Sequence, residues 1–529
     1  MKIGFAGSPK NRTIADEVHR WSREHLMESL WNKDPTVWSR EPVPELADRL
    51  GWLTLPTTAA RHMDQIDKLR QEAVGRGVRH IVLCGMGGSS LAPEVFAHSL
   101  PKEPGHPSLI VLDSTHPDAV AAVVDSIDVS ETWFVIASKS GGTIETLSFM
   151  RYFWAHASAT TDSPGDHFIA ITDPDSDLEH IASERGFRST FLADPEVGGR
   201  YSALSAFGLV PAGLIGCDVR ALLAAGRAAA ALCGPETPLE RNPGFVIGVT
   251  MAHSVQTGMD KVRFVGPGHG EPFGGWVEQL IAESTGKAGT GIIPVDGGPI
   301  RPHASDELVV SVGTGDDQAA SDIAIELANA TEIASAMFIM EMATAVAGAQ
   351  LGINPFNQPD VQRAKVLANE AMEGKLAEVA EAVSIRSPEL YTIVGSELGT
   401  ETPSYISIQA YIAPNRVNDA ALERLQFAMV EGTGAATTVG YGPRFLHSTG
   451  QLHKGGPSGG VFLQIVDTPQ SEVQIPEATF AFNALIAAQS AGDRLALEDA
   501  GRTVISVTLG SDPEAGLVGL TNIVRSVAP

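Results

Sequence analysis

A loop that could bind an anion occupies residues 138–143, within the string "VIASKSGGTIET". The apolar β-formers before it predict a buried strand, and the pattern after it predicts the first turns of a helix. Helix N-termini present unpaired N–H groups, glycines let the backbone approach an anion, and hydroxyl and ammonium groups add donors. We therefore predict a phosphate site whose side-chain donors are Ser138, Lys139, Ser140 and Thr143. An ordinary strand-to-helix turn with a Ser or Thr cap is the alternative.

A second glycine turn, "GMGGSS" at 85–90, follows the preceding predicted strand. With Asp113 at the end of the next strand, this turn raises the alternative of a dinucleotide site. Ser90 stands where that fingerprint has its third glycine, and the alternative leaves the loop at 138–143 without a role. Two anion-binding turns on neighbouring strands suit one sugar phosphate, one turn holding the phosphate and the other contacting the sugar.

Two charged residues stand in apolar surroundings. Arg200 lies in "VGGRYSALSAFGLVP", where its planar guanidinium suits an oxyanion, with a structural ion pair as the alternative. In "EQLIAESTGK", Gln279 and Glu283 share one face of a predicted helix. Glu283 could act as an acid and base, or could form a solvated ion pair with Lys287 four residues later.

Two later strings carry further candidates. "LGINPFNQPDVQRAK" ends a core helix, turns, and places Lys365 on a new helix. "GPRFLHSTGQLHKGGP" contains His447, His453 and Lys454. Two histidines six residues apart with no acid between them make a poor metal site, so we expect no metal.

The elements that must position these residues alternate between strands and helices from residue 80 onwards. This alternation predicts an α/β fold of two αβα domains, each with a doubly wound parallel sheet, in which ligands bind at the carboxyl ends of strands. We expect an N-terminal helical segment at 1–75, a first domain at 76–238 and a second at 239–529, divided near "GPETPLERNPG". One long helix is expected from about 321 to 350.

Composition excludes several classes of partner and location. The net charge of −26 makes the average surface repel nucleic acid and anionic membranes, so neither is an expected partner. Three scattered cysteines indicate a reducing cytoplasm rather than a disulfide framework. The apolar stretch from Ile333 to Ile353 carries Glu341, which favours a core helix over a membrane span.

Taken together, five strings resemble the successive signatures of the phosphoglucose isomerase family, whose halves are sugar-isomerase (SIS) domains. They are "GMGGSSLAPE", "SKSGGTIET", "GGRYSALSAFGLVP", "EQLIAESTGK" and "GINPFNQPDVQRAK", and they cover residues 80–365 in the family's order. The chain is most similar to the isomerase half of bifunctional transaldolase–phosphoglucose isomerase proteins, and the transaldolase half is absent. The resemblance implies interconversion of glucose 6-phosphate and fructose 6-phosphate, without a cofactor.

The resemblance also implies a role for each residue. Glu283 would be the acid and base, Arg200 would stabilise charge, and His447 and Lys365 would open the sugar ring. The phosphate would be bound by the four side chains of the 138–143 loop, and the sugar would be lined by Gly88, Ser89, Gln279 and Gln358.

The chain departs from the family in the order of its segments. "LHSTGQ" at 446–451 stands after the lysine string rather than about twenty residues after the glutamate, which implies a rearranged second domain. We assign the ring-opening role to His447 and keep His303, twenty residues past Glu283, as the fallback. The family further implies a homodimer that lends the histidine between subunits. The alternatives are a dual phosphoglucose/phosphomannose isomerase, a non-catalytic SIS-type sugar-phosphate sensor and, ranked lower, an NAD-binding protein.

Overall fold

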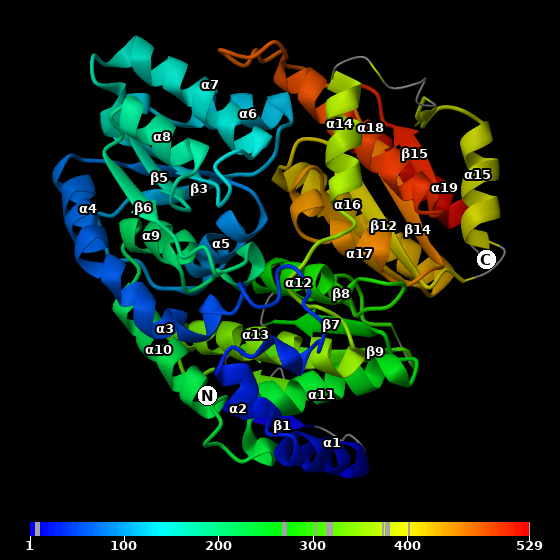
Figure 1. The fold of residues 1–529 in the computed structure, drawn as a ribbon. Coiled ribbons are helices and arrows are strands. Elements are labelled where there is room, and N and C mark those ends of the chain that lie inside the picture. Colours follow the sequence, from blue (N-terminus) through cyan, green and yellow to red (C-terminus); the bar gives the residue numbers. More distant parts are fainter. Residues whose placement is uncertain are drawn as a thin grey trace.

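The described residues form three five-stranded sheets, an α/β fold of mainly parallel strands flanked by helices (Figure 1). The computed structural model describes residues 1–5, 11–266, 272–301, 304–313, 321–372, 375, 381–399 and 402–527. His303, the fallback histidine, lies outside the described residues.

The first sheet has the order β3-β2-β4-β5-β6, and all of its pairings are parallel. Its strands are β2 (His80–Gly85), β3 (Ser108–Leu112), β4 (Thr132–Ala137), β5 (Phe168–Thr172) and β6 (Ser189–Leu192). The helices from this part of the chain are α4 (Met63–Gly75), α5 (Leu91–Ser99), α6 (Pro117–Ser126), α7 (Ile144–Thr160), α8 (Asp177–Glu184), α9 (Ala206–Leu214) and α10 (Val219–Leu232).

The central strands of this sheet are buried on both faces, which explains why they read as continuous apolar runs. Phe134 of β4 stacks on Phe153 and Phe168 with ring centroids 4.6 and 5.1 Å away. Truncating such a ring to alanine costs about 3–5 kcal/mol. β4 ends at Ala137, so the loop at 138–143 begins directly after this buried strand.

The second sheet has the order β1-β10-β9-β7-β8. Its strands are β1 (Lys2–Phe5), β7 (Lys261–Val265), β8 (Ile293–Asp296), β9 (Glu307–Gly313) and β10 (Ile323–Glu326), of which only β1 runs antiparallel. Its helices are α11 (Pro243–Gln256), α12 (Phe273–Thr285) and α13 (Ile333–Leu351), and the N-terminal segment adds α1 (Asn11–Arg23), α2 (Leu26–Trp31) and α3 (Leu55–Thr58). α14 (Gln362–Met372) follows α13 in the chain but packs against a helix of the third sheet.

The structure differs from the prediction at two places in the chain. The N-terminal segment is not wholly helical, because β1 pairs with β10. The helix expected from about 321 starts instead at Ile333, because the β-branched residues Ile323 and Ile325 belong to β10.

α13 is apolar on all sides and is buried on all sides, as a core helix must be. Among the described residues it is the one helix long and apolar enough to cross a membrane, and 89% of the apolar window is buried inside the protein. One continuous apolar core joins α13 to the first and second sheets. These two sheets therefore form one folded body.

The third sheet is the main difference from the prediction. Residues 239–529 were expected to form one domain, but their strands belong to two separate sheets. The third sheet has the order β11-β15-β14-β12-β13 and is parallel throughout. It contains β11 (Val383–Ser384), β12 (Tyr405–Tyr411), β13 (Ala436–Tyr441), β14 (Gly460–Val466), β15 (Thr503–Thr508) and the helices α15 (Glu389–Gly399), α16 (Arg416–Thr433), α17 (Gly450–Gly455), α18 (Phe482–Asp499) and α19 (Pro513–Val527).

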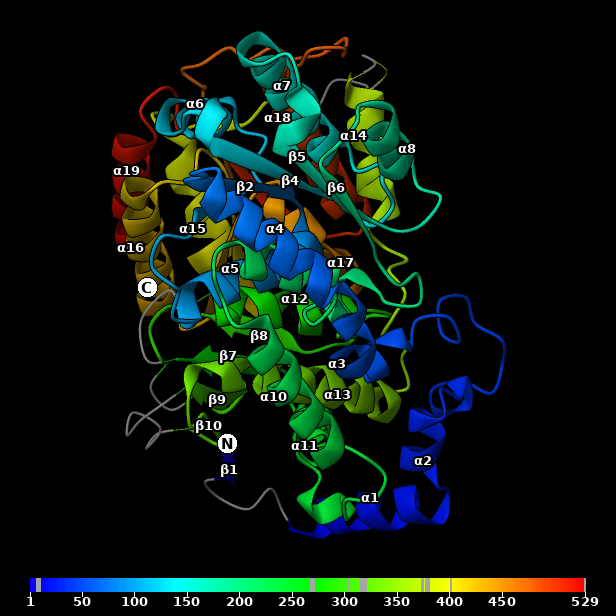
Figure 2. The same cartoon turned by 90° about the vertical axis from the view of Figure 1, so that its left-hand side faces the viewer.

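This sheet has an apolar core of its own and lies beside both other sheets (Figures 1 and 2). A smaller apolar cluster, including Ile293 of β8 and Phe462 of β14, joins it to the second sheet. α14 also packs along α18, a helix of the third sheet. The alternating strand and helix pattern is the same in both sheets, so periodicity alone could not reveal where one sheet stops and the next begins.

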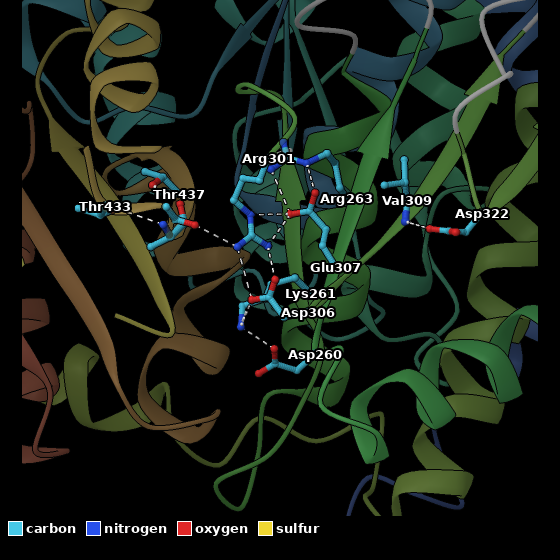
Figure 3. A network of polar contacts seen from close by, with 12 residues as sticks. Asp260, Lys261, Arg263, Arg301, Asp306, Glu307, Val309, Asp322, Thr433 and Thr437 are labelled. Carbon is cyan, nitrogen blue, oxygen red and sulfur yellow. Dashed lines mark hydrogen bonds and ion pairs between the residues drawn. The ribbon is translucent and has the colours of Figure 1, made fainter. Parts of the chain in front are cut away.

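A buried ion network also joins the second and third sheets (Figure 3). Arg263 of β7 pairs with Glu307 of β9 through contacts of 2.6 and 3.2 Å. Arg301 donates to Glu307 at 3.0 Å, to Asp306 at 2.8 Å and to the Gly434 carbonyl beyond α16 at 3.2 Å. Because buried charges are tolerated only when paired, this network favours one docking position of the two sheets.

Candidate active site

The loop at 138–143 joins β4 to α7 at the carboxyl end of the first sheet. The hydroxyls of Ser138 and Thr143 lie 2.9 Å apart, and the Ser140 hydroxyl accepts from the Gly142 amide at 3.3 Å. Ser140, Gly142 and Thr143 line a cavity of about 270 Å³. Its position at a helix N-terminus suits a phosphate group.

Lys139 differs from the other donors of this loop. Its ammonium group pairs with Asp173 and donates to the Pro195 carbonyl at 3.2 Å. Burial raises the pKa of Asp173, against the opposing effect of Lys139. Lys139 is not among the side chains that line the 270 Å³ cavity, so the structure separates it from Ser140 and Thr143.

Glu283 lies inside the protein near the end of α12, with only 5% of its surface exposed. The Gln279 amide, one turn earlier, donates to it at 3.2 Å. Burial raises the pKa of Glu283, while Arg200 and Lys287 act in the opposite direction. A carboxylate with a raised pKa in a shielded site is suited to proton transfer.

Lys287 is buried too, so it does not form a solvated ion pair with Glu283. Its ammonium group donates to the Asn354 carbonyl at 2.6 Å. Burial, assisted by Arg200, lowers the pKa of Lys287 to about 6. The alternative of a surface salt bridge is therefore wrong.

Arg200 lies beside Glu283, with its Nε 3.8 Å from Glu283 Oε2. Its Nη2 donates to the carbonyls of Phe356 and Asn357 at 2.5 and 3.3 Å, and the residue is 2% exposed. Within the described part of the chain, Nε and Nη1 have no hydrogen-bond partner. Buried guanidinium groups are normally satisfied, so these two N–H groups mark a place where an anionic oxygen can bind.

His447 ends the 3-10 turn Arg444–His447, which follows β13 in the third sheet. Its Nε2 lies 2.9 Å from Oε1 of Glu145 on α7, and its carbonyl accepts from Gln279 at 2.8 Å. Gln279 thus bridges Glu283 and the segment that carries His447. Gly87, with φ of +53°, leaves room for this carbonyl, because a Cβ there would collide with it.

Glu145 is a site residue that sequence reasoning missed. It is 4% exposed and lines the same cavity as His447. Burial acts to raise the pKa of Glu145, but the adjacent His447 and its hydrogen bond outweigh burial and leave that pKa lowered. The available signal was an acidic residue in the first turn of α7 beside the predicted phosphate loop.

Lys365 of α14 lines the cavity together with His447, so the structure brings these two predicted residues together. Gly88 and Ser89 lie in the turn after β2, and the Gly88 carbonyl accepts from Ser202 at 3.2 Å. Gln358 is exposed, in the loop that joins α13 to α14. It directly follows Asn357, whose carbonyl accepts from Arg200.

The other histidine of this segment, His453, is not part of the cavity lining. It is 2% exposed and bonds Gln409 at 3.1 Å. Burial lowers its pKa well below the ordinary value. Among the described residues no group of three or more His, Cys, Asp or Glu side chains is arranged to hold a metal ion.

The features that raised the dinucleotide alternative have other partners. Asp113 pairs with Arg444 at 3.1 Å and accepts from Ser90 at 3.2 Å. A Cβ at Gly88 would collide with the Gly199 backbone. The glycine turn therefore packs against protein backbone, and the acid beyond β3 anchors the turn that carries His447.

Comparison with known proteins shows which family part of the chain is similar to. A family model for phosphoglucose isomerase matches residues 61–291. The chain is 29% identical over 391 residues to the glucose-6-phosphate isomerase of Rubrobacter xylanophilus, an alignment that covers 60% of this chain and 88% of that protein. It is 34% identical over 218 residues to a probable glucose-6-phosphate isomerase of Haloarcula marismortui, over 40% of this chain and about half (48%) of that protein.

Solved structures share the fold. A hypothetical protein from Thermus thermophilus matches with a TM-score of 0.56 and 23% identity, over 68% of this chain and 97% of the other. A glucose-6-phosphate isomerase from Chlamydia trachomatis matches with a TM-score of 0.56 and 18% identity, over 70% and 88%. The matched range includes the loop at 138–143, Arg200 and Glu283. Residues 61–291 of the chain therefore resemble the phosphoglucose isomerase family.

Proposed function

We propose that this protein interconverts glucose 6-phosphate and fructose 6-phosphate. The observation that carries the proposal is the ion pair of Glu283 with Arg200, whose Nε and Nη1 have no hydrogen-bond partner among the described residues and lie buried beside the carboxylate. The family match and the names of its relatives support the same reaction.

The phosphate binds at the loop of Ser138, Ser140 and Thr143, where the N-terminus of α7 adds partial positive charge. Lys139 contributes positive charge at longer range, because its ammonium group is held by Asp173. This binding energy is remote from the reacting carbons and holds C1 and C2 near Glu283.

The sugar arrives as a closed ring, so O5 must gain a proton and O1 must lose one. His447 and Lys365 line the same cavity and supply this exchange. Glu145 orients the imidazole through its 2.9 Å contact with Nε2. Gly88, Ser89, Gln279 and Gln358 contact the sugar in this proposal.

Glu283 then moves one proton between C2 and C1 through a cis-enediolate. Both carbons present that proton on one face, so a single carboxylate serves both ends. The negative charge that develops on the enediolate oxygens is stabilised by Nε and Nη1 of Arg200. No step uses a metal ion or an organic cofactor.

The site draws on all three sheets of one chain, since His447 comes from the third sheet of the same molecule. We therefore propose that each chain contains a complete site, so a homodimer is not needed to supply the histidine. We retain the predicted cytoplasmic location, which the three free buried cysteines suit.

A coupled assay with fructose 6-phosphate and, in parallel, mannose 6-phosphate tests the proposal. We expect turnover of fructose 6-phosphate. Turnover of both sugars would favour the dual phosphoglucose/phosphomannose isomerase. Binding of the sugar phosphate without turnover by folded protein would overturn the proposal and favour a sensor.

A further inference from the structure

Gln489 of α18 is a buried glutamine at the junction of the first and third sheets. Its Nε2 donates to Glu145 Oε1 at 2.7 Å, and its Oε1 accepts from the Thr115 hydroxyl at 2.6 Å. Gln489 is 4% exposed and Thr115 is fully buried. Both ends of the amide are therefore used, and both partners belong to the first sheet's part of the chain.

The chemistry of these groups fixes the orientation of the amide. An ionised carboxylate only accepts hydrogen bonds, so the NH₂ group of Gln489 must face Glu145. The amide oxygen then faces Thr115, whose hydroxyl must donate. Reversing the amide would set oxygen against oxygen at Glu145, so one orientation is strongly favoured.

Gln489 and His447 bind the same carboxylate oxygen, Oε1 of Glu145. The position of that oxygen determines where the imidazole lies and which of its nitrogens carries the proton. The lowered pKa of Glu145 keeps the carboxylate ionised, so Nε2 of His447 is the protonated nitrogen. A group that holds Oε1 in place therefore acts on the imidazole through Glu145, and Gln489 itself also lines the cavity.

The backbone that carries Gln489 is itself anchored. Asp493, one turn later on α18, pairs with Lys454 of α17 at 2.5 Å, and their side chains are 0% and 4% exposed. α17 begins three residues after His447. On the other side, His116, next to Thr115, bonds Asp467 beyond β14 at 2.9 Å. Contacts from the first and the third sheets therefore hold the backbone around Gln489 and Thr115 in place.

We propose that Gln489, oriented by Thr115, is a positioning residue for the Glu145–His447 pair. This inference rests on the proposed function only for its kinetic consequence. Its structural consequence, one fixed tautomer of His447, can be observed without turnover.

The test compares Gln489→Leu, Thr115→Val and Thr115→Ser with a matched control, Gln464→Leu. Gln464 is also a buried glutamine of the third sheet, but it donates to the Ser490 carbonyl and does not contact Glu145. The readouts are kcat and KM for fructose 6-phosphate between pH 5 and 9, and ¹⁵N NMR of the His447 ring, assigned with a His447→Ala variant.

We expect Gln489→Leu to lower kcat roughly tenfold or more with KM changed far less, because misplacing a catalytic group by about 1 Å costs up to ~100-fold. The His447 signals should change from one tautomer to a mixture. Thr115→Val should show both effects more weakly, Thr115→Ser should restore the wild-type behaviour, and Gln464→Leu should keep the wild-type tautomer.

Wild-type tautomer signals in both Gln489→Leu and Thr115→Val would overturn the inference. If Gln489→Leu does not fold, Thr115→Val decides alone. If the wild-type protein turns over no sugar phosphate, the proposed function fails, but the NMR comparison still decides the role of Gln489.

Discussion

The Nε2 atom of His447 lies 2.9 Å from Oε1 of Glu145, although 302 positions separate them in the chain. Glu145 stands in the first turn of α7 in the first sheet's part of the chain, and His447 ends a 3-10 turn after β13 of the third sheet. The contact places a histidine beside the helix that follows the loop at 138–143, within one chain. The catalytic roles proposed for these groups can each be tested by substitution.

Replacing Glu283 by glutamine should lower isomerase turnover by orders of magnitude while leaving sugar-phosphate binding nearly unchanged. The amide keeps the shape of the side chain but cannot take up the carbon-bound proton. Steady-state kinetics and calorimetric binding of fructose 6-phosphate measure the two effects.

Glu278→Gln is a matched control on the same helix. Burial raises the pKa of Glu278 well above the ordinary value, so glutamine resembles its protonated form and activity should persist. Substantial activity in Glu283→Gln would remove Glu283 from the proton transfer.

His447→Ala should abolish most turnover of the ring-closed substrate, and His303→Ala should not. His447 lines the cavity with Lys365 and is held by Glu145. Initial rates of both variants with glucose 6-phosphate make the comparison. A severe loss only in His303→Ala would show that the ring-opening histidine has been assigned to the wrong position.

Mixing two inactive variants should not restore activity. In the structure, Gln279 of the same chain contacts both Glu283 and the His447 carbonyl, so we expect each site to take both residues from one molecule. Glu283→Gln and His447→Ala subunits would be co-expressed with different tags, and any species that carries both tags would be purified. Its isomerase activity would be compared with the activity of each variant alone.

If the histidine were lent across a two-fold interface, a mixed dimer would contain one intact site. Recovery of activity in the doubly tagged fraction would then contradict a site complete in one chain. Wild-type subunits carrying the same two tags control for effects of the tags.

Glu341→Gln should make stability less dependent on pH. Glu341 is 2% exposed in apolar α13, its Oε1 has no partner among the described residues, and burial raises its pKa well above the ordinary value. The folded chain therefore binds this proton more tightly than the unfolded chain. The associated stability is complete below the ordinary glutamate pKa of about 4.3 and falls as pH rises toward the folded value, by up to about 1.4 kcal/mol per pH unit.

Thermal unfolding of wild type and Glu341→Gln at pH 5, 6, 7 and 8 measures this dependence. The variant should gain stability relative to wild type as pH increases. Exposed Glu423→Gln serves as control and should parallel the wild type. A constant difference between Glu341→Gln and wild type at all four pH values would mean that Glu341 is ionised in the folded protein.

The local pattern of the sequence determined the strand, loop and helix around residues 138–143 and the helical placement of Glu283. Both depend on interactions within a few residues: apolar runs that become buried strands, glycines and hydroxyls at a helix start, and side chains one helical turn apart. The α/β class with mainly parallel sheets follows from the same alternation of elements, and the structure confirms it.

Only the tertiary structure decided which of these elements meet. Glu145 and Gln489 read as ordinary polar residues, because nothing near them in the chain indicates partners hundreds of positions away. Lys139 stood beside the other donors of its loop, but a contact with Asp173 turns it away from the cavity. The division of residues 239–529 between two sheets depended on which strands share hydrogen bonds. The apolar pattern of a buried parallel strand does not show which other strand it pairs with.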